Sequence, residues 1–186
     1  MRKKRLATLI GIGLTLFTLP AFSATSTLSE KDRDLLRDLH KGNLEEIALG
    51  NMAKSKTSNA AVKDFANRMI TDHIKVDHQV EQLAAKEGLT LSSSPETMDQ
   101  TTEKELARHS GSDFDRRYVD AMLEDHQKDI AKVQDTLCGI TNVEVRTLLT
   151  KALPIFENHI RIAEHVAGQI GVPPDKGLNH PEHPTS

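Results

Sequence analysis

The sequence predicts an all-α protein, a bundle of four long helices, and three observations point to this class. The chain of 186 residues has no tryptophan, one tyrosine and few β-branched runs, while the good helix formers Ala, Leu, Lys and Glu are common. In four segments, apolar residues recur every three or four positions, which is the period of one helix face. Three of these segments repeat a phrase around a central histidine: MITDHIK, MLEDHQK and IFENHIR.

Residues 1–23 have the features of a secretory signal peptide. Four basic residues, Arg2 to Arg5, precede an apolar run over 6–19 and small residues before a cut after Ser23. The apolar run is shorter than the roughly 20 residues that a membrane-spanning helix needs. We therefore expect an exported, periplasmic protein without a transmembrane segment in the mature chain. Peripheral association with the outer membrane stays open.

The first helix is predicted over residues 29–56. Ser29 is followed three residues later by Asp32, the signature of a capping box that satisfies free backbone donors at a helix start. The apolar face of this helix contains one carboxylate near its middle, that of Glu46. This face comprises Leu35, Leu39, Gly42, Glu46, Leu49 and Ala53.

The second helix is predicted over 58–87, with Ser58 at its start and Gly88 at its end. Its short link to the first helix makes the two an antiparallel hairpin. The next connection, 88–111, is long and holds a short helix candidate that begins at Pro95. A long connection between the second and third helices is typical of ferritin-like bundles. The sequence therefore predicts a ferritin-like four-helix bundle with a crossover at this place.

The third and fourth helices are predicted over 112–138 and 142–170, and they form a second hairpin. With the first pair they make one domain over 24–170. The tail, 171–186, is rich in proline, contains His180 and His183, and is expected to be disordered. Capping-box-like pairs open the two helices: Ser112 with Asp115, and Thr141 with Glu144.

The net charge and the single cysteine limit which partners and which disulfide bonds this protein can have. The whole chain has 24 basic and 27 acidic residues, and removing the four basic residues of the leader leaves 20 basic residues and a net charge of −7. An acidic exported protein is not expected to bind nucleic acid. Cys138 cannot form an internal disulfide; we expect it to be buried, the alternative being a bond to another chain.

The histidine of each repeated phrase lies inside the apolar face of its helix. With Glu46, the histidines His73, His126 and His159 give each of the four helices one inward, metal-competent side chain. Burying four polar groups together costs several kcal/mol unless something satisfies them. Imidazole and carboxylate are ordinary ligands of iron, copper and zinc. These four residues are therefore predicted to bind a transition metal. A metal-free polar layer that responds to pH is the alternative.

Acidic neighbours of the histidines have two interpretations. Asp77 and Asp129 each follow a core histidine by about one turn, and either can accept the other ring N–H. Asp72 lies three residues before Lys75, a spacing typical of a weak ion pair at a solvated helix edge. We expect Asp72 at such an edge, with an inward role as a metal ligand as the alternative.

Several segments resemble one bacterial family. They are GNLEEIALG at 42–50, VKDFA at 62–66 leading into MITDH, Phe114-Asp115 with Tyr118, Met122 and His126, and Leu153-Pro154 with His159. Over about residues 30–170 the chain is similar to the domain of unknown function 4142. The resemblance implies an exported, helical, ferritin-like protein, sometimes described as an outer-membrane protein, without an established activity. It also implies the same polar set, Glu46, His73, His126 and His159.

The chain departs from ferritin-like di-iron proteins at three positions. Those proteins place a glutamate three residues before a ligating histidine, and here the positions hold Ile70, Leu123 and Phe156. The pattern therefore favours a single ion, or a histidine-rich site, over a carboxylate-bridged di-iron centre.

The predicted function is metal binding in metal handling or envelope stress defence. The alternative is a non-catalytic structural or stress protein of the envelope. The sequence has no serine nucleophile elbow, glycine-rich phosphate loop or CxxC pair, so no catalytic residue is predicted. Metal-dependent redox activity stays open. The expected partners are a metal ion and either a second copy of the chain or another envelope component.

Overall fold

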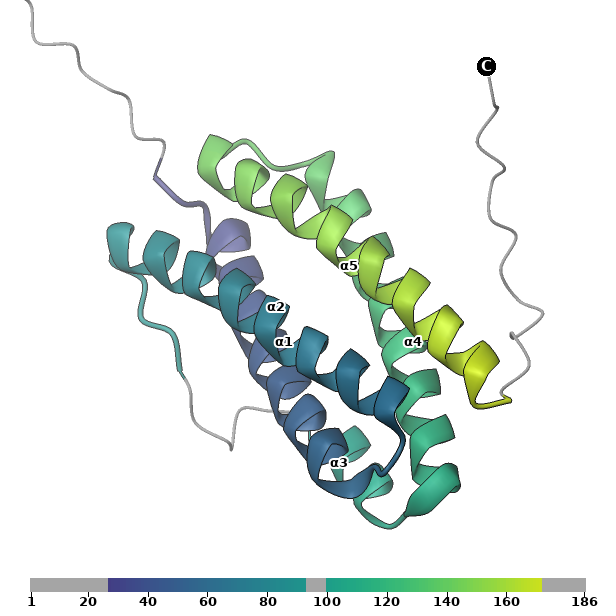
Figure 1. Cartoon of the computed structure of the whole chain (residues 1–186). Coiled ribbons are helices and arrows are strands. Elements are labelled where there is room, and N and C mark those ends of the chain that lie inside the picture. Colours follow the sequence, from purple (N-terminus) through teal and green to yellow (C-terminus); the bar gives the residue numbers. More distant parts are fainter. Residues whose placement is uncertain (1–26, 93–99, 172–186) are drawn as a thin grey trace, which may run out of the picture.

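Five α-helices make up the part of the chain that the computed structural model describes, residues 27–92 and 100–171, and no strand occurs there. The helices are α1 (Glu30–Lys56), α2 (Ala60–Lys86), α3 (Thr101–Ala107), α4 (Gly111–Leu137) and α5 (Val143–Gln169) (Figure 1). The all-α prediction is confirmed, and each long helix begins and ends within about two residues of its predicted bounds. The predicted leader, 1–23, and the tail beyond residue 171 lie outside the described residues.

Side-chain caps fix where α1, α2 and α5 begin. The N-cap of α4 is Ser110, whose side chain makes no capping hydrogen bond, so the predicted capping pair of Ser112 with Asp115 is wrong. The predicted capping box is present in α1, where Ser29 Oγ accepts from the Asp32 N–H and the Asp32 carboxylate accepts from the Ser29 N–H. In α2 and α5 the cap is an asparagine, Asn59 or Asn142, that directly follows the predicted Ser or Thr. Each asparagine Oδ1 accepts two backbone N–H groups. Asparagine is among the best capping residues, so the start moves by one residue.

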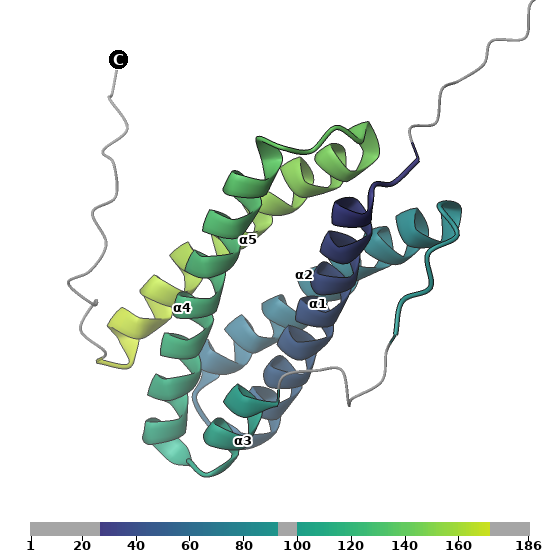
Figure 2. The ribbon, with the colours of Figure 1, turned by 180° about the vertical axis from the view of Figure 1, so that it is seen from behind.

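The long helices pack as two antiparallel hairpins, α1 with α2 and α4 with α5 (Figures 1 and 2). The hairpins meet mainly through α2 and α5, whereas α1 and α4 touch little. The short helix α3 lies at the C-terminal end of α1, where Lys56 Nζ donates to the carbonyl of Ala107. The α1–α4 side of the bundle is therefore its most open side.

Two apolar clusters fill the ends of the bundle. One contains Leu28, Leu36, Val80, Leu89, Ile140 and Leu149 among its members. The other contains Ala53, Phe65, Leu106, Phe114, Tyr118 and Val166 among its members. The three predicted core histidines belong to neither cluster and lie between them. The core is thus divided by a polar layer near mid-length.

The connection between the hairpins joins opposite ends of the molecule. Leu89, just after α2, packs in the same cluster as Leu28, which precedes α1. The next described helix, α3, lies at the other end, beside Lys56. The packing is that of a helix bundle, and the ferritin-like crossover stays a prediction.

Two further expectations concern the surface. Cys138 is exposed, so the prediction that it is buried is wrong. The residue caps the C-terminal end of α4, beyond Val133, the last buried residue of that helix. None of the described helices combines the length and the apolar character needed to cross a membrane.

Candidate metal centre

His73 of α2, His126 of α4 and His159 of α5 meet in the polar layer. Their exposed fractions are 2%, 1% and 1%. His73 Nε2 lies 3.4 Å from His126 Nε2, and His126 Nε2 lies 2.9 Å from His159 Nδ1. One nitrogen from each ring lies within 4.8 Å of the other two. The convergence of the three repeated histidines, which we call the histidine triad, is confirmed.

Phe156 holds two rings of the triad in place. This side chain lies one turn before His159 on α5. Its ring stacks on His73, with centroids 5.8 Å apart and planes at 15°, and meets the His126 ring edge-on at 5.8 Å. It occupies a position where a di-iron protein has a glutamate. The aromatic wall makes this side of the triad apolar, consistent with a site that lacks a bridging carboxylate.

Hydrogen bonds fix the tautomers of two triad histidines. His126 Nδ1 lies 3.0 Å from the carbonyl of Met122, and His159 Nε2 lies 3.3 Å from Asp72 Oδ2. A carbonyl and a carboxylate only accept, so each of these ring nitrogens carries the hydrogen and donates it. In the neutral rings, His126 Nε2 and His159 Nδ1 then carry no hydrogen, and each has a free lone pair. These two nitrogens lie 2.9 Å apart.

The tautomer of His73 follows from its hydrogen bond in the same way. His73 Nδ1 lies 2.9 Å from Asn43 Oδ1 of α1, so with the amide assigned in this orientation Nδ1–H donates. This leaves the lone pair of His73 Nε2 facing that of His126. Three lone pairs therefore point to a common place, while each remaining ring N–H is held by an acceptor. Metal-ligating histidines are held in this way.

The spacing of the nitrogens suits a tetrahedral ion. Two imidazole nitrogens, each about 2.05 Å from zinc, lie roughly 3.3 Å apart at a tetrahedral angle. The separation of 3.4 Å between His73 and His126 matches this value. The 2.9 Å between His126 and His159 needs to widen by roughly 0.4 Å to reach it.

Burial keeps the triad neutral. Removal from water lowers the pKa of His73 well below its usual value, and the nearby rings of His126 and His159 lower it further. Burial, with a smaller effect of His159, lowers the pKa of His126 to about 3. The pKa of His159 is lowered by burial, although its bond to Asp72 opposes the shift. At neutral pH the rings offer lone pairs rather than protons.

Asp72 lies inside the bundle, and its predicted place at a solvated edge is wrong. Only 4% of the residue is exposed. Its Oδ2 accepts from His159 and from Arg68 Nε, while Lys75 Nζ approaches Oδ1 at 3.5 Å. The predicted pair with Lys75 therefore exists, but Asp72 also reaches the triad. It orients the ring of His159 and does not belong to the triad itself.

The other acidic neighbours differ from their predicted roles. Asp77 accepts from His40 Nδ1 at 2.8 Å, and Asn43 takes the place expected for it beside His73. Asp129 lines a pocket, and His126 Nδ1 bonds instead to its own helix. Sequence reasoning did not single out Asn43 or His40, although they follow Leu36 at helix spacing along the α1 face against α2.

Glu46, predicted as the fourth ligand, is buried on α1 as expected but lies outside the histidine triad. The triad is the group whose nitrogens lie within 4.8 Å of one another, and Glu46 is not part of it. Its carboxylate lines a pocket between α1, α3 and α4. A second group at similar spacing consists of His40, Asp77 and the exposed Glu81, on the α1–α2 side.

A small cavity reaches the triad from the open α1–α4 side. It has a volume of about 50 Å³ and is lined by His73, Asn43, Asp129 and Phe156 among others. A water molecule needs only roughly 10–15 Å³ of such volume. A small exogenous ligand can therefore approach His73, which suits a three-histidine site with an open fourth position.

Comparison with models of known protein families identifies the family of this chain. The model of the family described as "Domain of unknown function (DUF4142)" matches residues 17–166. The chain belongs to the DUF4142 family. This confirms the resemblance seen over about residues 30–170. Among curated proteins no match to this DUF4142 chain is found.

Two solved structures share the fold of this DUF4142 protein. A DUF305 fragment from Deinococcus radiodurans is 16% identical, with a TM-score of 0.69 over 77% of this chain and 99% of that chain. A "putative spore coat protein" from Bacillus halodurans C-125 is 12% identical, with a TM-score of 0.67 over 83% of this chain and 96% of that chain. At these identities the likeness concerns the fold alone.

Proposed function

We propose that this DUF4142 protein is an exported, periplasmic bundle that binds one transition-metal ion through His73, His126 and His159. The observation that carries the proposal is the convergence of three ring lone pairs whose opposite N–H groups are all held by acceptors. Imidazole suits zinc, copper and iron. The bound ion would serve metal handling or defence against envelope stress. Export is supported by the leader features of residues 1–23.

The ferritin-like arrangement belongs to this proposal. Two observations support it: Leu89, after α2, packs with Leu28 at one end of the bundle, whereas α3 lies beside Lys56 at the other end. A crossover at this point makes α2 and α4 run parallel, as in bundles with one long connection. Lys86 near the end of α2 pairs with Glu144 near the start of α5, so a zero-length amine–carboxyl crosslink between these two side chains, identified by mass spectrometry, would form only in this order.

Elemental analysis of protein purified without an affinity tag tests the metal site. We expect about one transition-metal ion per chain, and less than roughly a tenth of that in His126→Ala, because a three-ligand site does not survive the loss of one ligand. The matched control is His78→Ala, an exposed histidine on α2.

Added Co²⁺ provides a second measurement on the same variants. Wild type and His78→Ala should show the intense visible bands of a tetrahedral cobalt site, and His126→Ala should not. A folded wild-type protein that neither contains metal nor takes up Co²⁺ would rule out the proposal. It would instead support the alternative of a metal-free polar layer in an envelope protein.

A further inference from the structure

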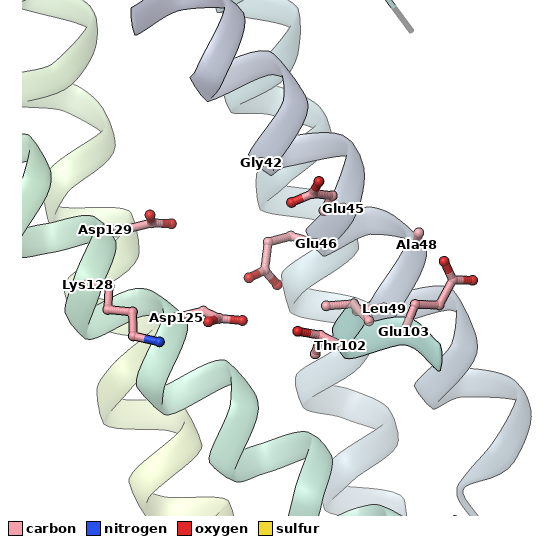
Figure 3. Close-up of a pocket in the computed structure, with 10 residues that line it drawn as sticks. All are labelled: Gly42, Glu45, Glu46, Ala48, Leu49, Thr102, Glu103, Asp125, Lys128 and Asp129. Atoms are coloured by element: carbon pink, nitrogen blue, oxygen red, sulfur yellow. The ribbon is translucent and has the colours of Figure 1, made fainter. Parts of the chain in front are cut away.

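An acidic pocket of about 220 Å³ lies between α1, α3 and α4. It shares Gly42 and Asp129 with the small cavity at His73, but no triad histidine lines it. Figure 3 shows the side chains that line it. Five carboxylates and one ammonium group line it: Glu45, Glu46, Glu103, Asp125, Asp129 and Lys128. Lys128 is already engaged by Glu124 on its own helix. The pocket therefore concentrates negative charge on the open side of the bundle.

Glu46 is the buried member of this group. The residue is 6% exposed, and its Oε2 has no hydrogen-bond partner within the described part of the chain. Figure 3 shows its carboxylate pointing into the pocket toward that of Asp125 on the opposite wall. Burial raises the pKa of Glu46 well above its usual value, and the charges of Asp125, Asp129 and Glu45 raise it further. A buried carboxylate without a partner calls for a cation or a proton.

We propose that this pocket binds one divalent cation of the hard, oxygen-preferring class, such as Ca²⁺, Mg²⁺ or Mn²⁺, through Glu46, Asp125 and Asp129. The donors are all carboxylate oxygens, which these ions prefer over imidazole. Two helices supply them, α1 for Glu46 and α4 for the two aspartates, so binding bridges the side on which the hairpins touch least. The three carboxylates do not belong to the histidine triad, although Asp129 also lines the small cavity at His73.

The width of the pocket defines how the ion is held. Within the described ranges, the groups whose ligand atoms all lie within 4.8 Å of one another do not include these three carboxylates. The ion therefore keeps part of its water shell, for which the pocket has room. We therefore expect weak binding of Ca²⁺, with a dissociation constant on the order of 10⁻⁴–10⁻³ M, the range of extracellular calcium-binding modules.

Calorimetric titration of the metal-free full chain with Ca²⁺, at constant ionic strength, tests the proposal. Ca²⁺ reports on the pocket because it avoids imidazole ligands. We expect one ion per wild-type chain and binding at least tenfold weaker in Glu46→Gln and in Asp129→Asn. The control is Asp135→Asn, which removes an exposed carboxylate from the same helix α4 and should bind Ca²⁺ like the wild type.

The Co²⁺ spectrum separates this site from the triad. Glu46→Gln should leave the cobalt bands unchanged while Ca²⁺ binding weakens at least tenfold. The proposal fails if the wild type does not bind Ca²⁺ or if Glu46→Gln binds it equally well. It also fails if Glu46→Gln abolishes the cobalt bands, since Glu46 would then be a ligand of the triad ion. Circular dichroism checks that each variant is folded. If Glu46→Gln does not fold, Asp129→Asn provides the test, because Asp129 is less buried and its replacement disturbs the core less.

Discussion

Asp72 links Arg68 and Lys75, on the surface of α2, to the histidine triad. Burial by itself would raise the pKa of this carboxyl group, but the hydrogen bonds from His159 and Arg68 hold the pKa below its usual value. Asp72 is therefore an ionised acceptor. It fixes the proton of His159 on Nε2 and leaves Nδ1 free to face the other two rings.

Replacing Asp72 should weaken metal binding without removing a ligand. In Asp72→Asn a neutral amide replaces the carboxylate, so the His159 ring becomes less basic and less firmly oriented. We expect the affinity for Zn²⁺ to fall by roughly 10–100-fold, the usual effect of losing such a partner. Competition with a chromophoric chelator measures the change. Lys75→Gln, which alters only the exposed partner of Asp72, should change the affinity less than about twofold; equal losses in both variants would contradict this account.

At the scale of the elements, α1 and α2 approach each other closely at Gly50. A Cβ atom at this position would lie 2.7 Å from Ile70 Cγ1 and 3.3 Å from the carbonyl oxygen of Ala66. Gly42, on the same helix, has nothing within 4 Å of its equivalent atom. The two glycines thus differ in packing although both are helical.

The same substitution should have opposite effects at these two sites. Gly50→Ala forces Ile70 or the helix backbone to shift, and we expect a loss of about 1–2 kcal/mol in the free energy of unfolding. Gly42→Ala only removes backbone freedom from the unfolded chain, and it should add about 0.5–1 kcal/mol. Urea unfolding of both variants measures the difference. Changes of the same sign would show that the α1–α2 contact is not as close as described.

For the molecule as a whole, the triad makes stability depend on pH. Each triad histidine has a folded-state pKa below the unfolded value of 6.5. Its stabilising contribution is complete above pH 6.5 and is lost as the pH falls toward the folded pKa, because the unfolded chain then takes up the proton first. The raised pKa of Glu46 acts in the opposite direction, favouring the folded state at low pH.

Metal-free protein should therefore lose stability between pH 6.5 and 5. Well below pH 6.5, each histidine that stays neutral contributes a slope of about 1.4 kcal/mol per pH unit. Replacing His126 by Gln should reduce the pH slope of the unfolding free energy by about 1.4 kcal/mol per pH unit, the contribution of one proton. Replacing the exposed His78 by Gln should leave this slope unchanged. Urea unfolding in the presence of a chelator at several pH values measures this. The Glu46 contribution is common to all three proteins and cancels in the comparison; identical slopes would show that the triad is not neutral in the folded state.

Prediction from sequence worked best where the signal is local. Neighbouring residues alone determine the cap at Ser29, the glycine at the end of α2, Gly88, and the helical period of the apolar residues. These three signals place the bounds of the long helices to within about two residues. The triad was also predictable, because the histidine stands at the same place in three apolar stripes. Asp72 and Asn43 were not assigned to it, because their roles depend on how far each helix is rotated about its axis, which only neighbouring helices define.

The sequence by itself thus determined four long amphipathic helices, their ends and one histidine inside each of three. The tertiary structure decided which polar groups face one another. It brought Asp72 inward, paired Asp77 with His40 and directed Glu46 into a separate pocket. The physical reason is that a helix face follows from the spacing of residues along one chain, whereas a ligand set depends on the offset and rotation of helices from distant parts of the sequence.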